Sequence, residues 1–454
     1  MSSALASRPE SEPSSKLDRP LLTSSRLLIG GCAVLLLAPL AFGAVESWAI
    51  FALETSAVVL LAAWAVRQQI ASKLEVVRHP LYAPMAAFGA LILVQWVSGI
   101  TAYRYVTYSR LLLYSSYALL VFVITQTLKR SSQLRKLVWL LCGYGGALAF
   151  FALIQGIAPN GKLYWVFPLE QGGQIYGPYV NHNHYAGLME MLTPFPLVLA
   201  ATRHVSGNRK VAVAGVAALM AGTIFLSGSR GGMLAFTCQI AVLSLLLWPQ
   251  RGRWKQHLVL GFFLAATIGL LLWIGGNELT RRLTSIHTET QQELSGGVRL
   301  TIDRDCLRMW RERPFFGWGL GTFPVVYPQF RSFYTRFFVN QAHNDYLQLL
   351  AETGLAGLAI ALWFLGVTFR RAWRKLENWT ETANGTLTVA ALLGCIGILV
   401  HSFLDFNLQI PANAALFYVL CAIAAGEPIQ ETRHHRLRRH HSLILETQSD
   451  AVSS

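Results

Sequence analysis

Long apolar segments recur along the whole chain, and they constrain its fold more than any other feature. Of the 454 residues, 53% are hydrophobic and only 13% are charged, whereas about 25% charged residues is usual in a soluble domain. The segments are long enough to cross ~30 Å of hydrocarbon as helices. They lack the alternating polar positions of a membrane β-barrel. The sequence therefore predicts an all-α polytopic membrane protein.

The apolar segments predict about twelve transmembrane helices. Nine of them fall in residues 27–275 and three in residues 343–426, separated by a large outer loop at 276–342. Residues 1–26 are predicted to be a disordered tail and 427–454 a basic tail, with no soluble second domain. The predicted helices are 27–45, 48–66, 81–100, 108–127, 137–157, 184–202, 211–227, 231–248, 257–275, 346–369, 386–403 and 412–426.

The formal net charge of +15 is distributed in a way that predicts orientation. Alternate connections such as "LKRSSQLRK", "TRHVSGNRK" and "RRAWRK" each hold at least three Lys or Arg, and the other short connections hold few. By the positive-inside rule, the basic connections and both termini lie in the cytoplasm. The excess also favours contact with anionic membrane lipids. Nucleic acid is therefore not an expected partner.

With this orientation, the unusual polar segments all fall on the outer face of the membrane. Scattered polar residues of a helical core would not be expected to collect on one side, so a shared outward-facing site is indicated. The segments are "YGPYVNHNHYAG" (176–187), "SGSRGG" (227–232), "HND" (343–345) and "HSFLDFNLQIP" (401–411), together with the long loop.

Arg230 lies between two predicted helices and is flanked by glycines. Glycine lets the backbone approach a ligand closely, and a guanidinium can bind phosphate in a bidentate way. The helix that starts at residue 231 directs its N-terminal amides to the same side, which favours an anion. The alternative is an interfacial arginine in a tight turn.

The long loop contains a second group of arginines. In "SGGVRLTIDRDCLRMWRERPFFGWGLGTF" (295–323), Arg299 and Asp303 share one face of a predicted helix that Pro314 ends. Arg299, and with it Arg304, is predicted to face the membrane surface and an anionic ligand. The alternative is a soluble amphipathic helix with a solvated charged face.

His343 begins the tenth predicted helix at the outer rim, beside Asn344 and Asp345. A histidine at the lip of an outward cavity suits proton transfer near neutral pH. Gln348 and Glu352 follow on the same helix and are expected to lie deeper. The alternative for the polar cluster is a helix cap.

The "NHNH" segment (181–184) raises the question of a metal site. His182, His184, His343, His401 and Asp405 are possible ligands, but the excess of Lys and Arg on this face opposes a divalent cation, and the spacing fixes no tetrahedral set. The six cysteines form no CxxC pair. No metal and no cofactor are predicted. Candidate partners of a sugar or phosphate are Asn181, Asn183 and His184.

At this point the sequence resembles a known family. His343-Asn344, nine residues and then Gly354-x-x-Gly357 is similar to the H-N-x9-G-x-x-G signature of the O-antigen ligase and polymerase family of bacterial polysaccharide assembly. "SGSRGG" and "PFFGWGLGTF" (314–323) resemble that family's Ser-Arg-Gly segment and Pro-x-x-Gly-x-Gly loop. "NHNHYA" and "HSxxDF" (401–406) also fit.

The resemblance implies a GT-C-like glycosyltransferase with about twelve helices in the bacterial inner membrane and a site facing the periplasm. It would move a glycan from an undecaprenyl-diphosphate carrier to a glycan, lipid or protein hydroxyl, with inversion and without metal. His343 would be the catalytic histidine, and Arg230 and Arg299 would bind the diphosphate, with Arg304 in reserve. Further candidate substrate-binding residues are Asn344, His401 and Asp405.

Other functions remain open on the sequence. A protein O-oligosaccharyltransferase would differ only in its acceptor, a Ser or Tyr hydroxyl. A bicarbonate or small-solute transporter would place ionisable residues near mid-membrane, on repeated and broken helices. A third possibility is a structural member of a polysaccharide export complex. Because the polar residues crowd one rim, surface chemistry is favoured over transport.

Overall fold

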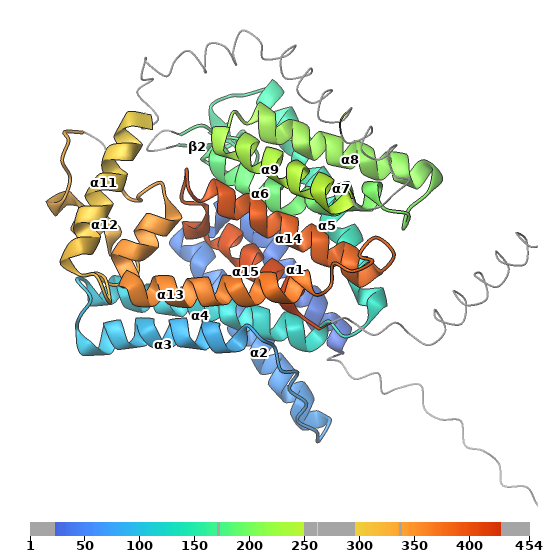
Figure 1. Cartoon of the computed structure of the whole chain (residues 1–454), viewed down its shortest axis with the longest axis horizontal. Helices are drawn as coiled ribbons and strands as arrows, with labels where there is room; N and C mark the ends of the chain where they lie inside the picture. Colours follow the sequence, from blue (N-terminus) through green and yellow to red (C-terminus); the bar gives the residue numbers. More distant parts are fainter. Residues whose placement is uncertain (1–22, 170–172, 249–260, 262–295, 336–337, 428–454) are drawn as a thin grey trace, which may run out of the picture.

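The computed structural model describes residues 23–169, 173–248, 261, 296–335 and 338–427, and helices make up most of it (Figure 1). Within this part of the chain, the strands are limited to one short antiparallel pair, β1 (Lys162–Leu163) and β2 (Phe167–Pro168). A helix satisfies its backbone polar groups internally, as an apolar segment in lipid requires. The predicted all-α class is therefore confirmed.

The helices follow the apolar segments closely. Their bounds are α1 (Ser24–Leu40), α2 (Ser47–Ile70), α3 (Tyr82–Ser98), α4 (Arg104–Thr127), α5 (Ser131–Ile157), α6 (His182–Leu192), α7 (Pro194–Ala201), α8 (Gly207–Leu226), α9 (Arg230–Leu247), α11 (Gly296–Glu312), α12 (Phe323–Val326), α13 (Asp345–Trp373), α14 (Ala383–His401) and α15 (Pro411–Ala425). Short 3-10 turns are η1 (Phe42–Ala44), η3 (Tyr327–Gln329) and η4 (Asn407–Gln409).

Seven of the described helices are long and apolar enough to cross a membrane, namely α2, α4, α5, α8, α9, α13 and α14. Three shorter apolar helices, α1, α3 and α15, accompany them. The predicted helix 184–202 is divided: α6 ends at Leu192 and α7 begins at Pro194, because proline cannot donate a hydrogen bond to the preceding turn. The predicted helix 257–275 lies outside the described residues. The count of about twelve spans remains a prediction.

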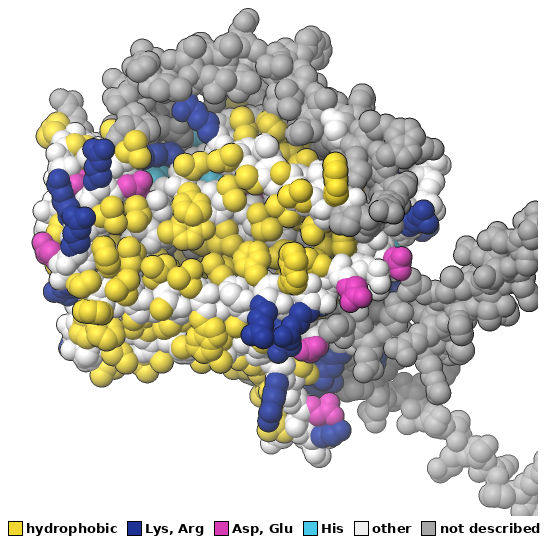
Figure 2. Space-filling model, in the orientation of Figure 1, with side chains coloured by type: hydrophobic (Ala, Val, Ile, Leu, Met, Phe, Trp, Pro, Cys, Tyr) yellow, Lys and Arg dark blue, Asp and Glu magenta, His cyan; other side chains and the backbone are white. Residues whose placement is uncertain are grey.

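The bundle is arranged around α14, which packs against α6, α7, α9 and α15. Of its apolar span, 72% is buried in the protein, whereas only 22% of the α2 span is buried. Figure 2 shows hydrophobic side chains over the middle of one face, with most Lys and Arg side chains toward its edges. Most of the α14 span is thus enclosed by protein, and most of the α2 span faces the surroundings.

Helix α13 is broken at Gly354. There it contacts the described part of the predicted outer loop (residues 296–335 and 338–342), here termed the outer segment. Gly354 has φ 64°, and a Cβ there would lie 2.4 Å from the Phe315 backbone, so only glycine fits. The amides of Leu355 and Ala356 donate to the carbonyls of Pro314 and Phe315 at 2.8 and 3.0 Å. The break therefore joins the outer segment to a membrane helix without leaving these backbone groups unpaired.

The carboxylate of Glu352 fixes the same junction from below. Its Oε2 accepts from the Gly321 amide at 2.8 Å, and its Oε1 accepts from the Phe323 amide at 3.1 Å. Glu352 is fully buried. Gln348, also buried, donates to the same carboxylate. Both side chains lie below the rim, as the sequence predicts, and there they hold the end of the outer segment.

Candidate active site

The polar segments singled out in the sequence meet at one end of the bundle. This end contains the N-termini of α6, α9 and α13 and the C-terminus of α14 with the turn that follows it. The Asp345 amide donates to the Ser402 carbonyl at 2.9 Å, and the Asn413 amide group donates to the His184 carbonyl at 3.0 Å. Segments far apart in the sequence thus form one site.

His343 and Asp405 form the centre of this site. The His343 Nδ1 lies 3.4 Å from the Asp405 Oδ1, which is within ion-pair distance, although the geometry does not make a hydrogen bond. The His343 side chain is 15% exposed and that of Asp405 is 1% exposed. The rings of His343 and His184 pack edge-on against Phe406, with centroids 4.8 and 4.7 Å away. An imidazole is therefore held at the surface with a carboxylate behind it.

The groups around Asp405 decide its charge. Burial on its own would raise the pKa of this carboxyl, but the nearby His343, Arg299 and His184 outweigh it and hold the pKa below its ordinary value. Asp405 also accepts from the Phe406 amide at 2.8 Å. It is thus an anion at neutral pH, able to stabilise a positive imidazolium on His343.

The two arginines of α11 have different positions. Arg299 is half-buried and donates to the Leu404 carbonyl at 2.8 Å, in the turn that carries Asp405. Arg304 is exposed. It lies five residues later, which is ~140° around a helix, so it cannot share the face of Arg299.

Asp303 lies on the Arg299 face of α11 and bonds to the cap of α13. Its half-buried position raises the pKa of the carboxyl, and the Asn344 side chain, which hydrogen-bonds to it, opposes this rise together with His343 and Arg299. Asn344 also caps α13, since its Oδ1 accepts from the amides of Tyr346 and Leu347 at 3.2 Å. The cap predicted from the sequence and the site are thus the same group of residues.

Arg230 is the first residue of α9, and the residues around it are closely packed. The Ser229 hydroxyl caps the helix by accepting from the Gly232 amide at 3.1 Å. A Cβ on Gly231 would lie 2.4 Å from the His401 ring, so this glycine allows α9 to approach α14. The Ser-Arg-Gly-Gly segment therefore places the exposed Arg230 at a helix N-terminus, which favours anion binding.

A buried chain of polar groups lies behind Arg230. His401 Nδ1 is 2.8 Å from Glu190 Oε1, and its Nε2 is 3.4 Å from the Ser229 hydroxyl. All three residues are buried. The chain joins α6, α14 and α9 at the point where Arg230 begins its helix. The structure thus places His401 below the surface, where a substrate would reach it only through these neighbours.

The remaining candidates lie at the start of α6. Asn181 caps the helix, and its Oδ1 accepts from the Asn183 amide at 2.8 Å. Asn183 and His184 are 6% and 7% exposed, so little of either side chain is open to a ligand. Within the described ranges, no group of three or more His, Cys, Asp or Glu side chains is arranged to hold a metal ion.

Three residues of the site are absent from the sequence prediction: Glu190, Ser229 and Phe406. Glu190 is an acidic residue inside an apolar run, and such a residue signals a buried partner or a function. Ser229 precedes a helix start, a position where serine is a common cap. Phe406 ends the "HSxxDF" segment, but its role depends on contacts with the rings of His184 and His343 from other parts of the chain.

One comparison with known proteins finds a related family. A family model described as O-antigen ligase matches residues 215–362. The matched segment contains Arg230, Arg299, Arg304, His343 and Asn344. It leaves out the α6 and α14 residues that complete the site. The curated proteins contain no match to this chain. Residues 215–362 are thus similar to the O-antigen ligase domain, which supports an O-antigen ligase-like family for this part of the chain.

Proposed function

We propose that the protein transfers a glycan from an undecaprenyl-diphosphate carrier to an acceptor hydroxyl at the outer face of the bacterial inner membrane. The observation that carries the proposal is the convergence of a helix-terminal arginine, a second arginine from the outer segment and a carboxylate-backed imidazole at one end of the bundle. The family points to a membrane glycosyltransferase-type enzyme. A diphosphate-linked donor is a substrate that these groups suit.

The donor diphosphate would be bound by Arg230 and Arg299. Arg230 adds a guanidinium to the N-terminal amides of α9, a combination that favours phosphate. Arg299 is held by its bond to the Leu404 carbonyl. Because negative charge on the diphosphate grows as the glycosidic bond breaks, preorganised cations stabilise the transition state more than the ground state. In this proposal the guanidinium groups, without a metal ion, balance that charge.

His343 would act as the general base. Its Nδ1 faces Asp405, so Nε2 is the atom that receives the proton of the acceptor hydroxyl. The acceptor oxygen forms a bond to the anomeric carbon from the side opposite the diphosphate. The bond from that carbon to the phosphate oxygen breaks, and the diphosphate leaves with the electron pair. The anomeric centre is inverted, and Asp405 stabilises the imidazolium that forms.

The proposed membrane topology is based on the position of the candidate site at one end of the helix bundle. About twelve spans in a GT-C-like bundle, with both termini in the cytoplasm, would place the site in the periplasm. The basic connections between α2 and α3, between α7 and α8 and after α13 lie at the helix ends away from His343, as the positive-inside rule requires.

The test is transfer by purified protein from a synthetic undecaprenyl-diphosphate glycan, measured as release of undecaprenyl diphosphate. His343→Ala and His343→Gln should each lower the rate by about 100-fold or more, because glutamine cannot accept the proton. Both variants should still unfold in one cooperative thermal transition, which would show that they fold. A His343→Gln variant with full activity would remove His343 from proton transfer.

Arg230 has a matched control in Arg104, since each is exposed and begins a helix. Arg230→Lys should reduce transfer strongly, because an ammonium group cannot make the bidentate contact. Arg104→Lys should leave it unchanged. Equal activity in both variants would show that Arg230 only stabilises the turn before α9. If no diphosphate is released by the parent protein from any glycan donor, a transporter or a structural role becomes the better explanation.

A further inference from the structure

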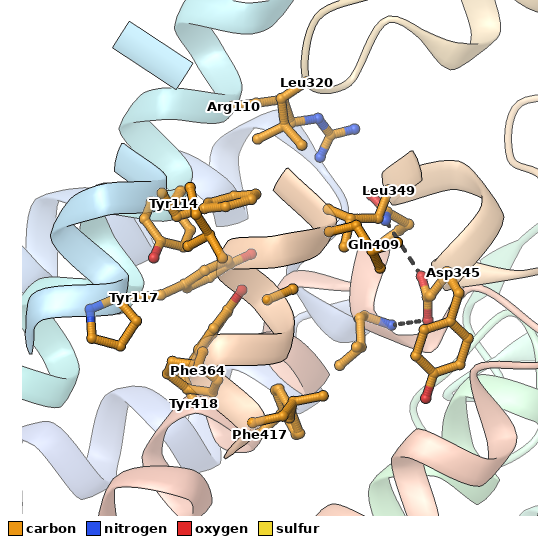
Figure 3. A pocket seen from close by; sticks show the side chains of 18 of the residues that line it. Arg110, Tyr114, Tyr117, Leu320, Asp345, Leu349, Phe364, Gln409, Phe417 and Tyr418 are labelled. Atoms are coloured by element: carbon orange, nitrogen blue, oxygen red, sulfur yellow. Dashed lines mark hydrogen bonds between the residues drawn. The ribbon is translucent and has the colours of Figure 1, made fainter. Parts of the chain in front are cut away.

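A second region suited to a ligand is the cavity enclosed mainly by α3, α4, α13 and α15 (Figure 3), here termed the α4–α13 cavity. Its volume is about 180 Å³. Its inner part is aromatic and aliphatic, and the largest rings that line it are Phe88, Tyr114, Tyr117, Phe364, Phe417 and Tyr418. This lining fits hydrocarbon and offers few polar partners to a sugar.

The cavity is elongated along the membrane helices. Its lining on α13 extends from Asp345, at the end that carries His343, to Leu365, on both sides of the break at Gly354. A long chain lying parallel to the membrane lipids would therefore fit the cavity better than a compact molecule.

One end of the cavity carries a positive charge. Arg110 is half-buried on the second turn of α4 and lies beside Gly321 of the outer segment. Figure 3 shows it at one end of the cavity, while aromatic side chains occupy the other end. Among the other polar groups along the wall, Asp345 and Gln409 are bonded to each other. The hydroxyls of Tyr114 and Tyr346 donate to backbone carbonyls. The combination of an apolar channel and one terminal cation matches a lipid with an anionic head group.

The cavity and the proposed diphosphate site lie on different sides of α14 and the turn that follows it. Arg230 begins α9, which packs against α14, α6 and α8, whereas the cavity is bounded by α3, α4, α13 and α15. Asp345 closes the wall between them through bonds to Ser402 and Leu408 at 2.8 and 3.0 Å. His343 is two residues from Asp345, at the edge of this wall.

We infer that the α4–α13 cavity binds the hydrocarbon chain of a lipid-anchored acceptor, whose anionic head group contacts Arg110. The inference rests on the proposed function, because it assigns the donor diphosphate to Arg230 on the far side of α14. A chain in this cavity then belongs to a second lipid. Its head group would approach His343 from the side opposite the donor, which is the arrangement that inverting transfer needs.

The first test uses a diazirine-labelled phosphatidic acid in phosphatidylcholine vesicles that contain the purified full-length protein. Labelling mapped by mass spectrometry should fall on the cavity residues, Tyr114 and Phe364 among them. Ala361→Trp fills the cavity and should reduce this labelling by at least about fivefold, since Ala361 lines it. Ala359→Trp, on the exposed side of the same helix, should not. Equal labelling in both variants would overturn the inference.

The second test concerns the head group. Arg110→Gln should weaken labelling by phosphatidic acid and leave labelling by a diazirine phosphatidylcholine unchanged, because only the former carries a net negative charge. Arg104→Gln, also on α4, is the control. If the two probe lipids label the parent protein equally, the cavity does not select an anionic lipid, and the inference is wrong.

A third measurement separates this inference from the proposed function. Ala361→Trp should raise the KM for a lipid-anchored acceptor at least about tenfold, and release of diphosphate from the donor to water or to a soluble sugar should be unchanged. His343→Ala should abolish release with every acceptor. If a photoreactive polyprenyl diphosphate labels the cavity and displaces phosphatidic acid, the cavity holds the donor chain. The acceptor assignment would then fail while the glycosyltransferase proposal stands.

Discussion

Two groups of buried polar side chains lie a short distance apart in this protein, and they are satisfied to different degrees. In the first group, which includes Glu352 and Asp345, both carboxylate oxygens accept hydrogen bonds from the chain. In the second group, which surrounds His343, several polar atoms have no partner. The first group fixes the outer segment and the turn after α14, and the second faces the candidate site.

The unpartnered atoms of the second group belong to candidate site residues. They include Nδ1 of His343, Oδ2 of Asp405, Nε2 of His184 and Nε of Arg299. Most buried polar groups in folded proteins are paired, so such atoms gathered in one place call for an explanation. A substrate with phosphate and hydroxyl groups can supply the missing partners. The comparison supports a structural role for the carboxylates with full sets of donors, and it is consistent with the proposal that the incompletely paired cluster binds substrate.

The largest expected effect comes from removing a structural carboxylate. Glu352→Ala would leave the Gly321 and Phe323 amides without their acceptor in a buried site, at a cost of about 4 kcal/mol. Thermal unfolding in detergent should occur at a much lower temperature, and less folded protein should be recovered. Glu312→Ala, at an exposed position on α11, is the control. Unchanged unfolding of the Glu352→Ala variant would contradict the structural role.

The next effect separates the two arginines of α11. Arg299→Ala should lower transfer about 100-fold, because it removes a preorganised cation from the diphosphate. Arg304→Ala should lower it less than about fivefold, since its side chain is exposed. Initial rates of undecaprenyl diphosphate release would measure both. The reverse ranking would move the second diphosphate site by one turn of the helix.

Asp405 and Asp303 should respond to pH in opposite directions. The pKa of Asp405 is depressed in the folded protein, so its stabilisation is present above the unfolded pKa, about 4, and is lost as the pH falls through the folded value. The pKa of Asp303 is raised, so its stabilisation is present at low pH and is lost as the pH rises through the folded value.

Substitution by asparagine tests this contrast. At neutral pH, Asp405→Asn should destabilise the protein by about 2 kcal/mol, because a buried charged partner of His343 is lost. Asp303→Asn should leave the unfolding temperature unchanged or raise it. Thermal unfolding at several pH values measures both variants. Equal losses of stability in the two variants would refute the assigned directions.

The smallest effect is expected at the cap behind Arg230. Ser229→Ala removes the acceptor of the Gly232 amide and should cost about 1 kcal/mol. Ser229→Asn should restore part of that stability, since asparagine is also a good cap. Thermal unfolding measures the stability lost with the cap. The KM for the donor measures whether Arg230 is still positioned to bind it. A raised KM in the alanine variant and a normal one in the asparagine variant would show that the cap positions Arg230.

Most of the helices can be predicted from the sequence, because an apolar run of sufficient length has few alternatives in a membrane. The start of α13 is also predictable from Asn344, a good cap before an apolar run. The division of the 184–202 segment is less evident, since Pro194 also suits the first turn of a helix. The sequence thus predicts which segments are helical more reliably than it predicts where a helix is interrupted.

The site is only partly predictable, because its pairs join residues far apart in the chain. Arg230, His343 and the 401–406 segment are visible as polar groups on one predicted face. The pairing of His401 with Glu190, and of His343 with Asp405, depends on how α6, α13 and α14 pack. The choice between Arg299 and Arg304 needs the rotation of α11 about its axis. One sequence does not specify these packing geometries.

His343 occupies a left-handed backbone conformation, with φ 55°. An L-residue pays ~1–2 kcal/mol there, whereas glycine adopts it freely and asparagine at lower cost. Replacement of His343 by either residue should therefore relieve this backbone cost while it removes the imidazole and its pairing with Asp405. A selection for abundance or heat resistance alone would drift away from histidine at this position, and only a selection that requires the finished polysaccharide would retain it.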